Sequence, residues 1–527
     1  MKLLSRQVLC MMGFFMLWGT FASAAPIEPG AFSTTWSTGS DTFITITLGD
    51  CDDGEDVYWE EVGNEANNGT DTCQVGLTTI TFPYAGEYRV DFKGNWTSVN
   101  FGGQANRNKF RTVEQWGNSV WTALEYSFSY VYDLTFNATD VPDLSNVTSL
   151  AGMFEAAENF NSPLNTWDVS NVTDMQSMFD SAIAFNQPLN NWDVSAVTTM
   201  RRMFRDALNF NQSLSNWDVS NVTDMDSMFS GGNYGINAFN QPLNDWDVSS
   251  VQYMSDMFAS TAFNQPLDDW DISVTNSLYG MFYNSSFDQT LGNWDIRNIT
   301  NFAYIFDLSN ISTLNYSDTL ERWAALPTLQ NNMNLYGVGQ SSSRTPYCDT
   351  VQAARDILVT TYNWIINDGG STPCFTISYT AGLNATLIGQ GTQTVIDGED
   401  STEVEVVPDA GFRFVKWSDE STQNPRTDTN LEANLTVSAI IEADPSGGGS
   451  SATRVGDRPK SYFYSPSSTS TPLTVTKESF IQSVRNLIDY LTKNEADLAN
   501  LTPEESVKII VGLREILRYL LTLLPGV

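Results

Sequence analysis

The sequence of 527 residues contains no histidine and few basic residues. It has 26 lysines and arginines against 62 aspartates and glutamates, a formal net charge of −36. Without imidazole, Ser/His/Asp and Cys/His catalytic sites, the HExxH zinc site and the usual general base are excluded. The negative charge repels phosphate backbones, so we expect no nucleic-acid partner. With 41% hydrophobic and 17% charged residues, the composition is typical of a globular, extracellular protein.

The first segment has the pattern of a secretory signal. Lys2 and Arg6 precede an apolar run over 8–18, and small residues at 22–24 follow. This predicts a signal peptide over 1–24, cleaved after Ala24, and a secreted or cell-surface protein. An anchor helix is the alternative, but the run is shorter than the roughly 20 apolar residues that span a bilayer.

Cysteine is scarce, with five residues in the chain, and Cys10 lies inside the expected signal. The other four allow three disulfide connectivities. We favour Cys51 with Cys73 and Cys348 with Cys374, because each pair closes a short local loop in a chain bound for an oxidising space. Zinc binding is the rival hypothesis, but no CxxC spacing or histidine supports it.

An internal repeat occupies the centre of the chain. The dipeptide Trp-Asp recurs at intervals of 25, 25, 29, 24 and 24 residues, at Trp167, Trp192, Trp217, Trp246, Trp270 and Trp294. The long interval contains 231–235, which we interpret as an inserted surface loop. With a degenerate first copy that has Pro142 in place of Trp, the pattern gives seven copies over 142–310.

A unit of 24 or 25 residues is too short to bury its own apolar face, so we expect the copies to stack in register. The stacking should place the indoles of Trp192 and Trp217 one above the other. Trp-Asp-Val-Ser predicts the strand of each turn, and the apolar spacing over 174–179 predicts a helical turn. Asn-Gln-Pro-Leu, as at 186–189, predicts the tight turn that closes each coil.

The pattern WDVSNVTDMxxMF followed by FNQPLxxWDVS resembles the BspA-like surface-protein repeat, a relative of leucine-rich repeats. The resemblance implies an extracellular or cell-surface solenoid that contacts partners, and it implies no catalytic residues.

The repeated Trp and Asp side chains could each have a structural role or a ligand-binding role. The Trp column could stack on sugar rings, but a stacked core also needs one large residue per turn. The Asp after each Trp, with Asp174 and Asp224, could bind Ca²⁺, although such residues more often accept backbone N–H groups at turns. We therefore favour core and turn roles and expect no cofactor, with calcium as the alternative.

The repeat region is acidic, with 20 acidic and four basic residues over 142–310, and Arg201, Arg202 and Arg205 lie in a single turn. By register, Arg205 follows Asp180 one turn earlier, and Arg201 falls between Gln176 and Asp226. We expect cross-turn salt bridges from Arg201 and Arg205.

Strand-rich segments flank the repeat. Residues 26–100 alternate as in a β-sandwich, and their Tyr-x-Gly-x-Tyr-x-Val run resembles the last strands of PKD-type immunoglobulin-like domains. Residues 101–141 and 311–374 are expected to cap the ends of the solenoid core. The run from Pro408 to Asp428 resembles the divergent internalin-type B-repeat and predicts a small β-rich module over 375–443.

The last part of the chain predicts a linker and two helices. Residues 444–476 are rich in Ser, Thr, Pro and Gly. Residues 477–524 have the apolar spacing of a helical hairpin, and charges interrupt its second helix, which argues against a membrane span. We expect the hairpin to self-associate or to dock to the envelope.

The sequence therefore predicts a mainly β, multidomain fold: a β-sandwich, a stacked-repeat solenoid, a small β-rich module and a C-terminal helical hairpin. The predicted function is non-enzymatic, an adhesin or contact protein for a protein or glycan on another surface. The alternative is a β-helical polysaccharide lyase or glycoside hydrolase, which can work with Asp, Arg and Ca²⁺ alone; only the cluster Arg201–Arg205 fits it.

Overall fold

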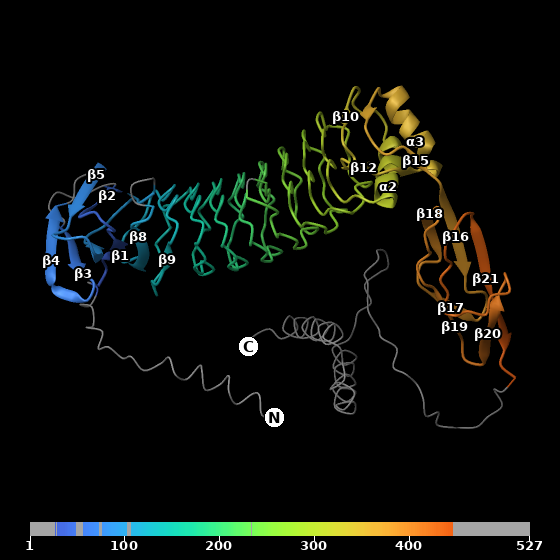
Figure 1. The fold of residues 1–527 in the computed structure, drawn as a ribbon, viewed down its shortest axis with the longest axis horizontal. Coiled ribbons are helices and arrows are strands. Elements are labelled where there is room, and N and C mark those ends of the chain that lie inside the picture. The colour runs from blue at the N-terminus through green and yellow to red at the C-terminus, as the bar shows by residue number, and fades with distance from the viewer. Residues whose placement is uncertain are drawn as a thin grey trace. The chain divides into compact units, whose positions relative to one another are not determined.

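The computed structural model describes residues 27, 29–48, 56–72, 76–102, 107–232 and 234–445. The expected signal peptide with Ala24, the Cys51–Cys73 disulfide, most of the linker and the helical hairpin over 477–524 lie outside these residues. Within them the fold is mainly β, with small sheets formed by the segments before and after the stacked repeats (Figure 1). No helix of the described residues has both the length and the apolar character of a membrane span.

The N-terminal part contains two sheets. One has six strands in the order β4-β3-β6-β1-β8-β9, and the other has three in the order β5-β2-β7. The strands are β1 Phe32–Ser37, β2 Phe43–Leu48, β3 Asp56–Glu61, β4 Asn64–Thr72, β5 Gly76–Thr81, β6 Glu87–Phe92, β7 Val99–Asn100, β8 Phe110–Gln115 and β9 Thr135–Phe136. Strands β8 and β9 come from the segment expected to be a cap. Because β8 pairs with β1, that segment shares a sheet with the strands before it.

The repeats over 143–310, called the repeat stack here, are joined by parallel bridges between successive turns (Figure 1). One column of bridges links Ser149, Asp174, Thr199, Asp224, Tyr253, Ser277 and Asn301, and a further bridge joins Asn237 to Thr261. The expected strand at Trp-Asp-Val-Ser is therefore wrong. At that position the chain turns, because the Asp193 carboxylate accepts the Ser195 N–H at 3.1 Å and the Ser195 hydroxyl at 2.6 Å.

The expected helical turn over 174–179 is also wrong. Every second N–H donates to the next turn, as from Met175 to the Thr199 carbonyl at 3.1 Å and from Ser177 to the Arg201 carbonyl at 2.8 Å. The N–H of Met178 closes a β-turn on Met175 at 3.2 Å. The third residue of this turn, Ser177, has φ 55°, the positive value that distinguishes a type II turn from a type I turn. A chain of tight turns thus reproduces the apolar spacing of a helix.

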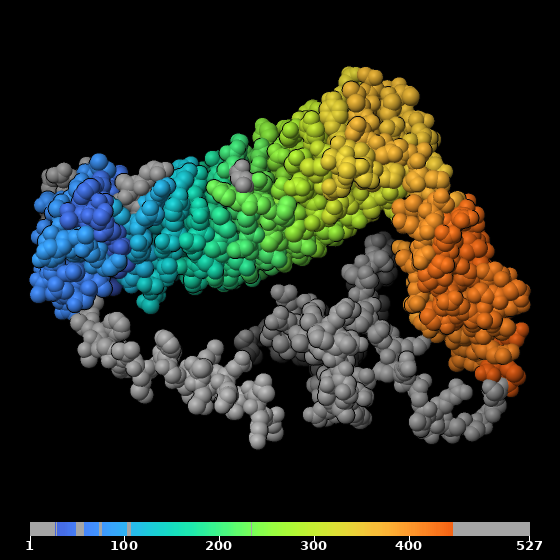
Figure 2. Space-filling view, viewed as in Figure 1, coloured from blue at the N-terminus to red at the C-terminus, as the bar shows by residue number. Residues whose placement is uncertain are grey.

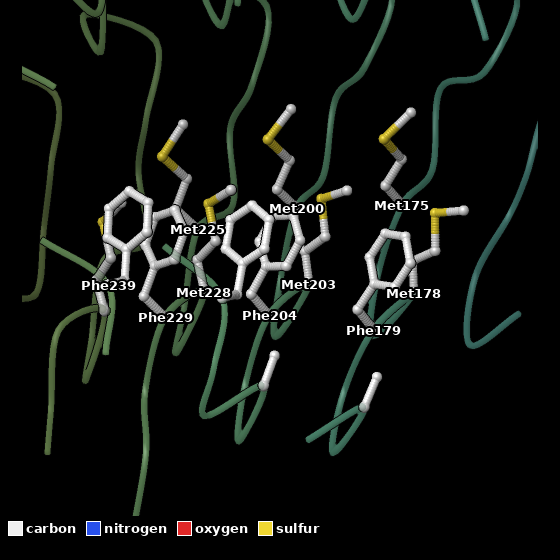
Figure 3. Close-up of a cluster of buried hydrophobic side chains, with 14 of the residues drawn as sticks. Met175, Met178, Phe179, Met200, Met203, Phe204, Met225, Met228, Phe229 and Phe239 are labelled. Carbon is white, nitrogen blue, oxygen red and sulfur yellow. The ribbon is translucent and has the colours of Figure 1, made fainter. Parts of the chain in front are cut away.

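The core of the stack is built from identical side chains in columns. Met and Phe of successive turns occupy equivalent places (Figure 3), and the rings of Phe179 and Phe204 stack 5.4 Å apart at 2°. The indoles of Trp192 and Trp217 are 6.5 Å apart at 2°, as the repeat predicted. These side chains are buried, so each turn covers the apolar surface of the previous one.

Polar ladders keep neighbouring turns in register. The Trp217 indole N–H donates to the Leu189 carbonyl of the previous turn at 3.1 Å. The Asn186 side chain accepts the Asn211 N–H at 3.0 Å and the Gln212 side-chain amide at 2.9 Å. Because these bonds repeat along the stack, a slip of one residue would leave polar groups unpaired.

The end of the stack is closed by a helical segment. It contains α2 Thr313–Ala324, a 3-10 turn Asp349–Val351, α3 Gln352–Asp356 and a π-helical turn Ile357–Thr361. The short strands are β10 Asn334–Leu335, β11 Gly339–Gln340, β12 Ser343–Arg344, β13 Tyr347–Cys348, β14 Ile365–Ile366 and β15 Ser371–Thr372. Trp323 of α2 continues the indole ladder, donating to the Leu291 carbonyl at 3.0 Å. One apolar cluster runs from Phe32 to Trp364.

The following module has its own core. Its strands are β16 Cys374–Thr380, β17 Ala385–Ile388, β18 Thr392–Ile396, β19 Glu405–Pro408, β20 Phe412–Trp417 and β21 Leu435–Ala443. Arg426 is buried beside Trp417, 5.2 Å from its ring, and bonds Asp419 at 2.8 Å. A disulfide joins Cys348 of the cap to Cys374 at the start of β16, as expected.

Candidate functional site

One face of the repeat stack, the turn face, consists of two residue pairs in each turn: the pair that follows the Met175 position and the pair that follows the Phe179 position. The cross-turn bonds fix which residues share a column. In each case an N–H group donates to a carbonyl of the next turn: Ser177 to Arg201, Arg202 to Asp226, Ser227 to Ser255, Asp256 to Tyr279, and Gly280 to Ala303. The second pair forms a similar column, so residues that are about 25 positions apart lie side by side.

The turn face is where the turns differ from one another. Its residues in successive turns are Gln176, Ser177, Asp180 and Ser181; Arg201, Arg202, Arg205 and Asp206; Asp226, Ser227, Ser230 and Gly231; Ser255, Asp256, Ala259 and Ser260; Tyr279, Gly280, Tyr283 and Asn284; Ala303, Tyr304, Asp307 and Leu308. Apart from the bridge column, most other positions of each turn repeat the same residue types, and these residues bond to the neighbouring turns. The scaffold is therefore constant while this face is chemically diverse.

The inserted loop lies against the same face. Gly231 packs against the carbonyls of Gly235 and Ser260, and a Cβ on Gly231 would come within 2.5 Å of both. Tyr234 and Ile236 are exposed, as expected for a surface loop. The loop therefore adds apolar surface beside the turn face. In the space-filling view, the coloured atoms of the stacked repeats form one continuous body (Figure 2).

The arginine cluster is partly neutralised. Arg205 bonds the buried Asp180 at 2.6 Å, as the register predicted. Burial raises the pKa of Asp180, and the Arg205 guanidinium opposes this shift. The expected bridge from Arg201 is not found in the described residues: Asp226 instead accepts the Ser255 N–H at 2.7 Å.

A depression of about 500 Å³, the tyrosine pocket, lies in the turn face near the end of the stack. It is lined by Asp256, Tyr279, Gly280, Tyr283, Tyr304 and Asp307. The three tyrosines are 39%, 37% and 38% exposed, so their rings are open to a ligand. The rings of Tyr279 and Tyr304 are 5.7 Å apart at 76°. The tyrosines therefore form walls rather than a flat surface.

The two carboxylates of the tyrosine pocket differ. Asp307 bonds Arg344 of β12 at 2.5 Å. Asp256 is half-buried and makes no side-chain hydrogen bond or ion pair within the described part of the chain. Burial, with a smaller contribution from Asp226, raises the pKa of Asp256 to about 6. Its carboxylate lies over Gly280, where a Cβ would come within 2.2 Å of Oδ1.

The Asp residues of the Trp-Asp dipeptides have the structural role that we favoured. Asp168 accepts the N–H and hydroxyl of Ser170, and these bonds lower the pKa of Asp168. Asp174 accepts the Gln176 N–H, and Thr199 separates it from Asp224 in the bridge column. The described residues contain no group of three or more Cys, Asp or Glu placed to hold a metal. Calcium binding stays an alternative prediction.

The sequence prediction missed the tyrosine pocket. A signal was present, because alignment of the copies on Trp-Asp puts Asp256, Gly280 and Tyr304 in one column. The indole columns, considered as a sugar platform, are buried and cannot stack on a ligand in this structure.

Comparison with known families identifies two parts of the chain. Residues 122–234 and 232–323 match the family described as Mycoplasma protein of unknown function, DUF285. Residues 375–445 match the divergent InlB B-repeat domain, which confirms the predicted B-repeat. No curated protein and no solved structure matches the chain. Both matches are consistent with a bacterial surface repeat protein. The PKD-like character of residues 26–100 stays a prediction.

Proposed function

We propose that the chain is a non-enzymatic, secreted or cell-surface protein whose repeat stack is a solenoid and whose turn face contacts a protein or glycan on another surface. The N-terminal sheets would serve as a PKD-like domain, and the B-repeat module as a spacer. The observation that carries the proposal is the turn face, where diverse residues, with Tyr279, Tyr283 and Tyr304 exposed among them, stand on a largely constant scaffold.

Exposed aromatic side chains support a contact role. Tyr126 and Tyr130 are exposed in the turn before the stack, and Tyr279, Tyr283 and Tyr304 are exposed near its end. Tyrosine is enriched in protein interfaces because it provides a large apolar area and a polar tip. The polar groups of the ladders are bonded within the chain, whereas Tyr279, Tyr283 and Tyr304 of the turn face leave their rings open to a partner.

Binding of the full-length chain to immobilised matrix proteins, glycans and envelope fractions tests the proposal. The variant combines Tyr279→Ala, Tyr283→Ala and Tyr304→Ala, and the control is Val274→Ala, an exposed residue outside the turn face. We expect the triple variant to lose the captured partner by about tenfold or more, as for interface hot spots, while the control binds normally. If all variants bind equally, the turn face is not the contact surface.

The enzyme alternative rests on Arg202, which has no ion pair within the described residues and shares its turn with Arg201 and Arg205. Incubation with uronic-acid polymers, with and without calcium, separates the two functions. Under our proposal no product forms. Product release that is abolished by Arg202→Ala would establish a lyase instead.

A further inference from the structure

The tyrosine pocket has the geometry of an aromatic cage. Tyr279 and Tyr283 come from one turn and Tyr304 from the next, and Asp256 comes from the turn before them. Gly280 keeps the centre open, because its φ of 59° suits glycine and a Cβ there would collide with Asp256. Tyr304 also packs against Tyr336 of the cap, 5.7 Å away at 44°. The tyrosine rings therefore lie at angles to one another around the Asp256 carboxylate.

The charge of the pocket favours a cation. Asp256 is a carboxylate that burial partly removes from water, and no cationic side chain of the described residues neutralises it. Tyrosine rings attract cations through the negative potential of their faces. Asp226 in the neighbouring turn adds a second negative charge nearby. A positively charged group in the pocket would gain from all of these interactions.

Two other ligand classes fit less well. A sugar chain stacks on coplanar rings, whereas Tyr279 and Tyr304 are close to perpendicular. A metal ion needs several oxygen ligands, but Asp307 is engaged by Arg344 and leaves Asp256 as the available carboxylate of the pocket.

We infer that the tyrosine pocket binds a lysine or arginine side chain of a partner protein, held by Asp256 and enclosed by Tyr279, Tyr283 and Tyr304. This inference rests on the proposed function, because it names the chemistry by which the turn face recognises its partner. The ammonium or guanidinium group bonds the Asp256 carboxylate, and the aliphatic stem lies along the tyrosine rings.

Calorimetric titration of the full-length chain with short peptides tests the inference. The probes are a glycine peptide with one lysine, its arginine counterpart, the same lysine peptide with an acetylated Nε, and a neutral oligosaccharide. We expect the two cationic peptides to bind. The acetylated peptide should lose binding by about tenfold or more, because acetylation removes the charge, and the oligosaccharide should not compete.

Two variants assign the binding to the pocket. Asp256→Asn keeps the shape and removes the charge, so the lysine peptide should bind about tenfold more weakly. The control, Asp245→Asn, makes the same charge change at an exposed residue outside the turn face and should change binding less than about twofold. Tyr304→Ala should weaken binding by severalfold.

Equal binding by Asp256→Asn and Asp245→Asn, or undiminished binding of the acetylated peptide, would overturn the inference. If the oligosaccharide displaces the peptide, the ligand of the tyrosine pocket is a glycan and the inference of a cation is wrong. These outcomes are distinct from failure of the proposed function, which is measured with the triple tyrosine variant and intact partners.

Discussion

At the scale of single residues, the carboxylate of Asp256 is available to bind a ligand, but its partial burial lowers the stability of the folded chain. Its carboxylate is partly buried without a counter-ion, so ionisation is less favourable in the folded chain than in the unfolded one. Because the raised pKa means that the folded state holds the proton more tightly, stability falls as the pH rises from about 4 through about 6. A residue kept at such a cost is typical of a binding site.

Asp256→Asn should therefore stabilise the protein at neutral pH. The shift from 3.8 to about 6 would correspond to about 3 kcal/mol, and partial exposure reduces the expected gain to about 1–2 kcal/mol. Urea unfolding measures this at pH 7 and again near pH 4, where the gain should nearly vanish. Asp245→Asn serves as the control. A gain that is the same at both pH values would show that the Asp256 charge is not its source.

Cation binding should follow the same ionisation. The groups that face Asp256 are Asp226 from the preceding turn and Tyr279, Tyr283 and the Arg344-paired Asp307 from the following ones. Asp256 itself has a pKa of about 6, which lies between pH 5 and pH 7.5, and burial also raises the pKa of Asp226. The lysine peptide should bind severalfold more tightly at pH 7.5 than at pH 5, because protonation removes the carboxylate charge. In Asp256→Asn the affinity should change much less with pH over this range.

The left-handed positions of the turn face give another residue-scale prediction. Ser227 has φ 57°, and Gly280 occupies the same column with φ 59°. Ser227→Val should lower the free energy of unfolding by about 1–2 kcal/mol, because a β-branched side chain is strained at positive φ. Ser227→Gly should change it by less than about 1 kcal/mol. Equal effects of both substitutions on thermal unfolding would contradict a left-handed turn at this position.

At the scale of elements, the sequence predicted the period, the buried columns and the Trp192–Trp217 stack, because these depend only on which residues repeat. It did not predict the backbone. Met175, Met178 and Phe179 have helical spacing, yet alternating left- and right-handed residues give the same spacing and direct every second N–H to the next turn. The pocket was missed because Tyr279 and Tyr304 each look like ordinary surface residues until the column is known.

The disulfide is the element-scale link that stabilises the cap. Cys348 and Cys374 are separated by 26 residues, and the bond closes the chain between β13 and β16. The variant with Cys348→Ser and Cys374→Ser should lose about 3 kcal/mol, since closing a loop of this size restricts the unfolded chain. Denaturant unfolding measures the loss, and a reductant should destabilise the native protein more than this variant. Coincident unfolding curves in oxidising buffer would contradict the prediction.

At the scale of the whole molecule, the repeat stack behaves as a one-dimensional assembly in which each turn contacts its neighbours. The distance between Trp167 and Trp192 is one full turn, so residues 167–191 can be removed without changing the register of the remaining columns. Thr166 would then join Trp192, and Phe204 would follow Phe154 in the core. The loss of Asp180 is compensated, because Glu155 takes its place opposite Arg205 by register.

The chain without residues 167–191 should therefore fold, unfold cooperatively with a modest loss of stability, and bind the lysine peptide as the full chain does, since the tyrosine pocket lies beyond the deletion. Removal of 167–179 is the control. It brings polar residues into the core columns and leaves ladder groups unpaired, so cooperative unfolding and peptide binding should both be lost. Calorimetry and peptide titration distinguish the two deletions. If both deletions were equally damaging, the turns would not be interchangeable units of one stack.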